Sequence, residues 1–130
     1  MKMGELYQSA DWKNEKHAPV IEVPETVKKG EPVIGTVSVG KEIPHPNKTE
    51  HHIEWIEVYF KPEGEKFPYL IGRFEFAAHG ASAQGPDTST VYTEPRATFA
   101  FRTEKPGVMI AVSSCNIHGL WESSMNIGVE

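Results

Sequence analysis

One cysteine and a small set of histidines carry the most distinctive chemistry of this chain. Cys115 is the only cysteine among 130 residues, so it cannot form an internal disulfide and must serve in packing, reactivity or metal binding. His118 follows it in a Cys-x-x-His spacing, which lets a thiolate and an imidazole meet one metal ion. Imidazole together with thiolate suits iron, copper or zinc. We therefore expect a metal site at Cys115 and His118. One thiolate accompanied by several imidazoles indicates a redox metal, and we favour iron.

The other histidines lie far upstream, and up to three of them can serve as ligands. His45 lies between two prolines that stiffen its loop, and His51 follows after a short polar stretch. His51 and His52 are neighbours at the start of an expected strand, where successive side chains point to opposite faces, so one metal is expected to bind only one of the two. His17 stands in a polar stretch and not on an apolar face, whereas His52 and His79 are expected to be structural.

Together these residues offer four imidazoles and one thiolate, one ligand more than tetrahedral zinc uses. Copper is the main alternative, because Cys115, His118 and Met125 follow the thiolate, imidazole and thioether order of blue-copper proteins, which are also β-sandwiches. Met125, however, falls in register with Ile127 and Val129, as a core-facing strand residue does, and a copper site would leave the upstream histidines unused. The third alternative is a β-sandwich interaction module whose histidines are incidental.

Charge argues against a nucleic-acid partner but favours a small anion at one place. The formal net charge is -5, so we expect no broad electrostatic surface for nucleic acid. Positive charge nevertheless accompanies the histidine segments, which would draw a small anion to them if they converge. The lysines concerned are Lys13, Lys16, Lys41 and Lys48.

Length and hydropathy point to one domain that acts in the cytoplasm. A chain of 130 residues has the size of one ordinary domain, so residues 1–130 are expected to share a single core. No apolar run resembles a signal core or is long enough to span a bilayer, so no membrane partner is expected. The lack of a disulfide framework agrees with a reducing compartment.

Short segments that alternate with period two, separated by ten prolines and eleven glycines, predict an all-β protein. We expect an immunoglobulin-like antiparallel β-sandwich of about seven strands, without the disulfide core of antibody domains. Only residues 3–13 offer a short helical turn, and loops are expected at residues 24–32, 61–68 and 79–90. The last loop is long enough to suggest a functional or interface role. The expected strands lie near residues 20–23, 33–39, 53–60, 73–76, 97–102, 108–114 and 125–129.

Ordered motifs along nearly the whole chain are similar to those of one known family. The motifs are Glu15-Lys16-His17-x-Pro19, Gly40-Lys41-Glu42-Ile43-Pro44-His45-Pro46-Asn47, Glu50-His51-His52-Ile53 and Cys115-Asn116-Ile117-His118-Gly119-Leu120-Trp121, with further likeness at residues 78–80, 85–86 and 91–95. The chain thereby resembles superoxide reductases of the one-iron, neelaredoxin type. Two-iron relatives carry an additional four-cysteine centre, for which this chain has no cysteines.

The resemblance implies one mononuclear iron per chain, with the Cys115 thiolate as its axial ligand and an open sixth position in the ferrous state. It implies four equatorial imidazoles, which match His17, His45, His51 and His118. The activity implied is the one-electron reduction of superoxide to hydrogen peroxide without oxygen release. Backbone N–H groups near Ile117 and His118 are expected to hydrogen-bond the sulfur and moderate its electron donation.

The resemblance also assigns two residues beside the open position and two kinds of partner. Glu15 matches the carboxylate that closes this position after oxidation, and Lys16 matches the cation that attracts superoxide and assists proton delivery. The electron donor implied is a small electron-transfer protein such as rubredoxin. Similar proteins are often homotetramers, and the loop at residues 79–90 is a candidate contact.

Overall fold

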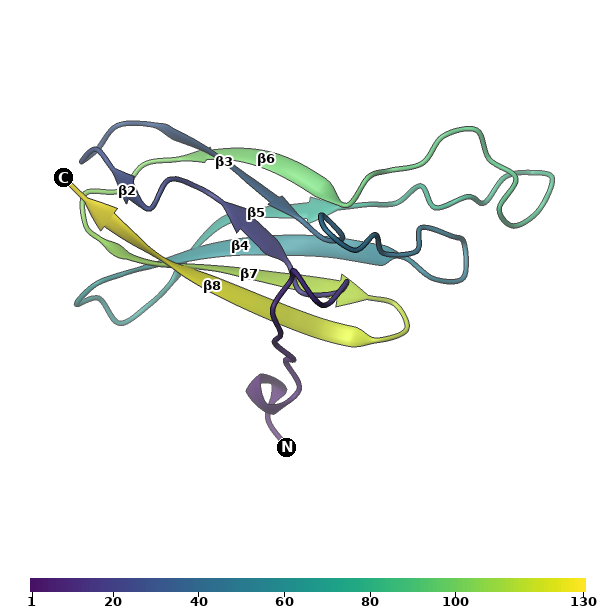
Figure 1. Ribbon diagram of the computed structural model, residues 1–130, viewed down its shortest axis with the longest axis horizontal. Helices are drawn as coiled ribbons and strands as arrows, with labels where there is room; N and C mark the ends of the chain where they lie inside the picture. Colours follow the sequence, from purple (N-terminus) through teal and green to yellow (C-terminus); the bar gives the residue numbers. More distant parts are fainter.

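Two β-sheets that face each other make up nearly all the regular structure of the computed structural model, which describes residues 1–130 (Figure 1). One sheet has three strands in the order β1-β3-β6, and the other has five in the order β2-β8-β7-β4-β5. Every strand pair is antiparallel except β2 with β8. The predicted β-sandwich is therefore confirmed. The strands are β1 (Val20–Glu22), β2 (Thr26–Val27), β3 (Val33–Ser38), β4 (Ile53–Pro62), β5 (Tyr69–Glu75), β6 (Arg96–Phe101), β7 (Gly107–Cys115) and β8 (Gly119–Val129).

Alternating side chains of both sheets form the core between the layers. On β4 the buried side chains include Ile56 and Val58, and on β7 they include Met109 and Ala111, with half-exposed residues between them. Each fully buried Ile, Val or Met side chain among these stabilises the fold by roughly 1.5–3 kcal/mol. Cys115 belongs to the same buried cluster, so the core extends to the end of β7 where the sulfur lies.

Element bounds differ from the predicted ones in a few places. β2 lies inside the predicted loop at residues 24–32, because a two-residue parallel pairing with the end of β8 has too few residues to show a periodicity. β5 and β8 begin earlier than predicted, at Tyr69 and Gly119. The predicted helical turn is a short 3-10 helix, η1 (Met3–Glu5). None of the helical structure is long and apolar enough to cross a membrane.

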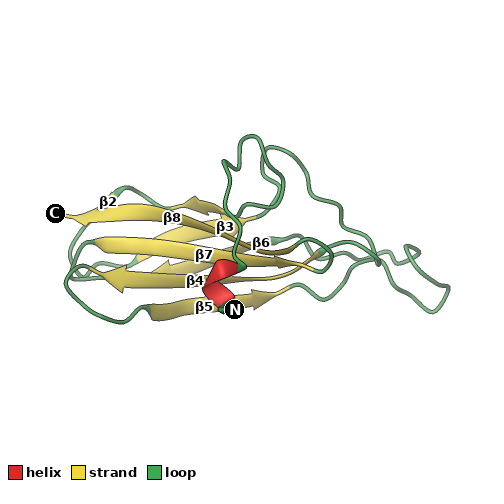
Figure 2. Ribbon diagram, turned by 90° about the horizontal axis from the view of Figure 1, so that it is seen from below, coloured by secondary structure: helices red, strands yellow, loops and turns green.

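One end of the sandwich gathers the segments that carry the conspicuous residues. β7 ends at Cys115, which pairs with Ile53 at the start of β4 and with Gly119 at the start of β8. The loops at residues 39–52 and 76–95 project beyond the sheets at this end, and the N-terminal segment hangs below β8 (Figures 1 and 2). Three distant segments of the chain therefore meet where β7 and β8 turn.

Candidate metal centre

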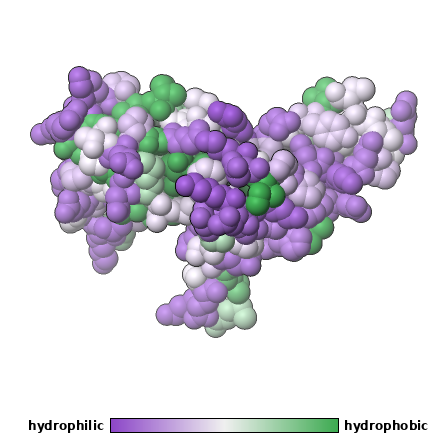
Figure 3. Space-filling model, viewed as in Figure 1, coloured by the Kyte–Doolittle hydropathy of each residue, from purple (hydrophilic) through white to green (hydrophobic).

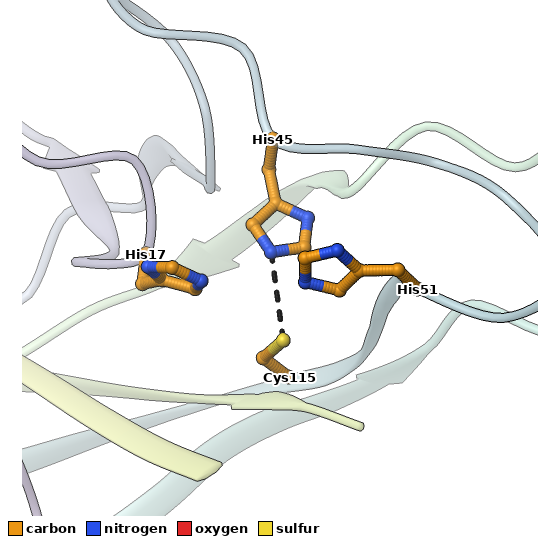
Figure 4. Close-up of side chains that lie close together, drawn as sticks. All are labelled: His17, His45, His51 and Cys115. Carbon is orange, nitrogen blue, oxygen red and sulfur yellow. Dashed lines mark hydrogen bonds between the residues drawn. The ribbon is translucent and has the colours of Figure 1, made fainter. Parts of the chain in front are cut away.

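Three imidazoles and the only thiol converge at this end of the sandwich (Figure 4). The ligand atoms of His17, His45, His51 and Cys115 all lie within 4.8 Å of one another. Cys115 Sγ lies 3.5 Å from His45 Nε2, and the cysteine is 3% exposed. Bonds of about 2.0–2.3 Å to a single ion produce ligand separations close to these. The structure thus brings together four residues that the sequence singled out.

His118 adds a fifth donor atom to the cluster. Its Nδ1 lies 3.2 Å from both His17 Nε2 and His51 Nε2, and 3.8 Å from Cys115 Sγ. Three ring nitrogens therefore face one another, and one proton between them can satisfy only one pair. A metal cation satisfies all of these lone pairs at once, so the donor set fits a metal with imidazole and thiolate ligands. His118 is the exposed member of the set and presents Nδ1, whereas the others present Nε2.

A tight turn between β7 and β8 positions the sulfur and His118 together. The backbone N–H of His118 donates to Cys115 Sγ over 3.3 Å, as expected from the sequence, and no such bond is present from Ile117. Gly119 follows with a φ of 83°, a left-handed conformation that glycine adopts without the steric penalty of a side chain. Hydrogen bonding to a thiolate stabilises its negative charge, so this turn provides a partner for a thiolate at Cys115.

Hydrogen bonds on the outer ring nitrogens fix the orientation of two imidazoles. His45 Nδ1 donates to the carbonyl oxygen of Pro46 over 2.7 Å, and His17 Nδ1 lies 2.5 Å from Glu15 Oε1. A proton on Nδ1 leaves Nε2 with its lone pair directed at the cluster, which is the tautomer that binds metal. Burial lowers the pKa of His45 to about 4, with the charges of neighbouring histidines and Lys16 adding to the effect, so its ring is neutral near pH 7.

Glu15 lies beside the cluster but points at the protein backbone. Its Oε2 accepts hydrogen bonds from the backbone N–H groups of His17 and Ala18, at 2.5 and 2.8 Å. Burial raises the pKa of Glu15, yet the hydrogen bonds from His17 and Ala18 outweigh it and hold the pKa below its usual value. The carboxylate is therefore ionised near pH 7 and orients the His17 ring in this structure.

Lys16 contributes positive charge to the surroundings of the cluster. Burial lowers the pKa of His51, and the charges of His118, His17 and Lys16 lower it further, which places the Lys16 ammonium within electrostatic reach of the cluster. Lys16 forms no ion pair with a carboxylate. Lys41, by contrast, pairs with Glu22. The charge of Lys16 is consequently available to an anion that approaches the site.

Comparison with known proteins shows the family. The model of the desulfoferrodoxin family matches residues 9–124. This chain belongs to the desulfoferrodoxin family. It is 58% identical to a superoxide reductase of Pyrococcus furiosus, covering 96% of this chain and 98% of that one, and 55% identical to a neelaredoxin of Megalodesulfovibrio gigas, covering 100% of both. A solved structure of the superoxide reductase (neelaredoxin) of Archaeoglobus fulgidus in the reduced form is similar with a TM-score of 0.88 and 63% identity, covering 95% of this chain and 98% of that one.

Membership of the desulfoferrodoxin family agrees with the motifs and not with the copper alternative. Met125 pairs with Met109 on β7. Cys115 lies six residue steps along β7 from Met109, which is about 20 Å at about 3.3 Å per residue. The thioether therefore lies far from the sulfur, and a site built from both is excluded.

His52 and His79 form a separate pair outside the cluster of donor atoms. Their rings stack with centroids 3.7 Å apart and an angle of 4° between their planes. His79 Nδ1 lies 2.9 Å from Asn47 Oδ1, and its Nε2 contacts the carbonyl oxygen of Phe76. The pair therefore joins the loop at residues 76–95 to the loop that carries His45.

Sequence reasoning missed two side chains that hold the candidate ligands. Trp121, to which the sequence analysis gave no role beyond its place in the Cys115 motif, stacks on the His17 ring with centroids 5.1 Å apart and an angle of 13°. Its indole N–H donates to the carbonyl oxygen of His118 over 3.2 Å. Gln8 donates to the same oxygen over 2.8 Å. Trp121 lies three positions after His118, and this closeness in sequence could have indicated a contact between the two. No sequence pattern connects Gln8 with His118, which is more than a hundred positions away.

Proposed function

We propose that this chain is a superoxide reductase, which converts superoxide, one electron and two protons into hydrogen peroxide and releases no oxygen. The observation that carries the proposal is the convergence of four imidazole nitrogens and one thiolate sulfur at one end of the sandwich. Relatives that bear the name superoxide reductase match nearly the full length of the chain and support it.

A mononuclear iron is the proposed cofactor. Five donors exceed the four that tetrahedral zinc uses, and nitrogen with sulfur suits a redox metal. Iron bound here would supply the single electron for superoxide and take it back from an external donor. The proposed ligands are His17, His45, His51, His118 and Cys115. Among them Cys115 would donate electron density to the bound iron, and the hydrogen bond from the His118 N–H to the sulfur would moderate this donation.

Lys16 and Glu15 are proposed to act beside the substrate. The unpaired Lys16 ammonium attracts the superoxide anion and holds a proton close to the developing peroxide. Glu15 is proposed as the carboxylate that closes the open coordination position after oxidation. To do so it must release its hydrogen bonds to His17 and Ala18, so the carboxylate has two alternative partners.

Replacing Glu15 with alanine is expected to change two measurable affinities. The iron affinity should fall about tenfold or more, because His17 loses the carboxylate that orients its ring. The oxidised protein should bind azide more tightly, because no carboxylate competes for the open position. Chelator competition and azide titration measure the two effects, with Glu50→Ala as the control, since the Glu50 side chain is exposed and makes no hydrogen bond. An azide affinity equal to that of the wild type would contradict the closing role.

Product analysis tests the activity itself. The reduced, iron-loaded protein is given superoxide without air, and hydrogen peroxide and oxygen are both measured. We expect one peroxide for each superoxide consumed, no oxygen, and oxidation of the protein. The zinc-loaded protein, which has no electron to give, is the control. Oxygen formed together with peroxide would identify a dismutase and overturn the proposal.

A small electron-transfer protein such as rubredoxin is proposed as the donor, and a homotetramer as the assembly. Ile117 is 56% exposed and lies two positions from Cys115, which supports a short route for electrons at this surface. Exposed apolar side chains on the loop at residues 76–95, such as Val91 at 69%, support a contact between copies. Figure 3 shows hydrophobic surface as separate patches, one of them on the projecting loops.

The cytoplasm is the proposed location, and residues 1–130 are proposed to act as one iron-binding domain. A thiol that has to remain reduced at Cys115 favours a reducing compartment. One buried cluster with side chains from both sheets reaches Cys115, which supports a single unit.

A further inference from the structure

The N-terminal segment is attached to β8 directly beside the candidate metal centre. The backbone N–H of Gln8 donates to the carbonyl oxygen of Leu120 over 3.0 Å. The carbonyl oxygen of Gln8 accepts from the backbone N–H of Glu122 over 2.8 Å. These two bonds make a parallel bridge between Gln8 and Trp121. The residues before Gln8 hang away from the sandwich (Figure 1). Gln8 is therefore held by its backbone, and its side chain has a defined place.

The Gln8 side chain reaches the turn that carries His118. Its amide Nε2 donates to the His118 carbonyl oxygen over 2.8 Å, and the Trp121 indole donates to the same oxygen over 3.2 Å. Both lone pairs of this carbonyl are thus engaged, one from the N-terminal segment and one from β8. The shorter of the two bonds comes from Gln8.

Holding this carbonyl restrains the peptide that follows His118, and Gly119 would otherwise leave that peptide free to rotate. Glycine populates more backbone conformations than any other residue, so a turn that ends in Gly119 needs external partners to adopt one of them. Two features of the metal centre depend on that conformation: the position of His118 Nδ1 and the hydrogen bond from the His118 N–H to Cys115 Sγ.

We propose that Gln8 is a positioning residue of the metal centre, which fixes the turn of His118 through the carbonyl oxygen of that residue. Gln8 does not touch the cluster of donor atoms and acts only through His118. The proposal rests on the proposed function to the extent that the cluster binds a metal ion. It extends the site to the N-terminal segment, ahead of the residues that the family model matches.

Metal affinity tests this role without reference to activity. Metal-free protein is titrated with Co²⁺ in competition with a chelator, and the thiolate-to-cobalt absorption band reports binding. We expect Gln8→Ala to weaken Co²⁺ binding about three- to tenfold, less than the loss of a sole orienting partner causes, because Trp121 still donates to the same oxygen. Gln84→Ala is the matched control: Gln84 is exposed and its side chain makes no hydrogen bond, so wild-type affinity is expected.

A second variant and a second readout separate positioning from a structural effect. Gln8→Glu keeps the size and the backbone bridge of residue 8 but cannot donate when ionised, so it should weaken binding at least as much as Gln8→Ala. In the iron-loaded protein both variants should lower the midpoint potential, because a weaker N–H to sulfur bond makes the thiolate a stronger donor and favours the oxidised state. Both are measured below the thermal transition of each variant.

Wild-type cobalt affinity and midpoint potential in Gln8→Glu would overturn the proposal, whatever happens to thermal stability. The outcome is independent of the proposed activity. Should the wild-type protein fail to reduce superoxide while the two Gln8 variants still weaken Co²⁺ binding, the proposed function fails and the role of Gln8 stands.

Discussion

Replacement of Cys115 by serine should reduce superoxide turnover to the uncatalysed background and remove the visible thiolate-to-iron band of the oxidised protein. A serine hydroxyl stays protonated near neutral pH and is a much weaker, harder donor than a thiolate. The sulfur lies 3.5 Å from His45 Nε2 and 3.8 Å from His118 Nδ1. Because Cys115 is the only cysteine of the chain, no other thiolate can take its place in the cluster. Its loss takes away the electron push that the proposed mechanism requires.

The measurements are the absorption spectrum, the iron content and the rate with superoxide. Serine is close to cysteine in size, so the buried end of β7 should still pack and the variant should fold, which circular dichroism verifies. Met125→Leu is the matched control: Met125 lies far along β8, and its loss should leave both band and rate intact. Retention of the band in Cys115→Ser would contradict the whole assignment of the centre.

Removal of the charge at Lys16 should slow the second-order reaction with superoxide by about tenfold, because local positive charge raises encounter rates with a small anion by about 10- to 1,000-fold. We place the expected effect at the lower limit of this range, because Lys16 contributes a single charge. Lys16 has no carboxylate partner that would cancel its charge. Its charge also contributes to the lowered pKa of His51, although burial and the neighbouring histidines contribute more. The rate should also depend less on ionic strength.

Rapid-mixing or pulse-radiolysis kinetics at several salt concentrations measure both effects in Lys16→Ala. Lys16→Arg keeps the charge and should retain most of the rate, which separates steering from shape. Lys28→Ala is the matched control, because Lys28 directly follows β2, which pairs with the far end of β8 from the metal centre. A salt dependence in Lys16→Ala equal to that of the wild type would show that Lys16 does not steer the anion.

The strands that carry strong alternation were predictable, and the weakly patterned ones were not. β4 alternates buried and half-exposed side chains over most of its length, a signal that depends only on the period of a strand. β7 is buried throughout from Ala111 to Cys115, and its run of apolar residues before them marks it as a strand of the core. β2 has two residues and forms only because the end of β8 lies beside it. The first half of β8, from Gly119 to Ser124, has no regular alternation, and its strand conformation comes from pairing with β7.

The identities of the candidate ligands were predictable because ligand chemistry belongs to residue types. A single thiolate with nearby imidazoles restricts the choice of metal, and the ordered motifs restrict it further. The partners of these ligands were not predictable in the same way. Gln8 and Trp121 are an ordinary polar and an ordinary aromatic residue until the chain folds and both donate to the His118 carbonyl oxygen.

By itself the sequence determined that this chain forms a β-sandwich and that it holds imidazoles and one thiolate, because alternation and side-chain chemistry are local properties. Only the tertiary structure decided that His118 presents Nδ1 to the Nε2 atoms of His17 and His51, that Glu15 orients His17, and that Lys16 keeps an unpaired charge. These relations join residues as far as 101 positions apart. Their geometry depends on where two sheets and three loops meet, which no local pattern contains.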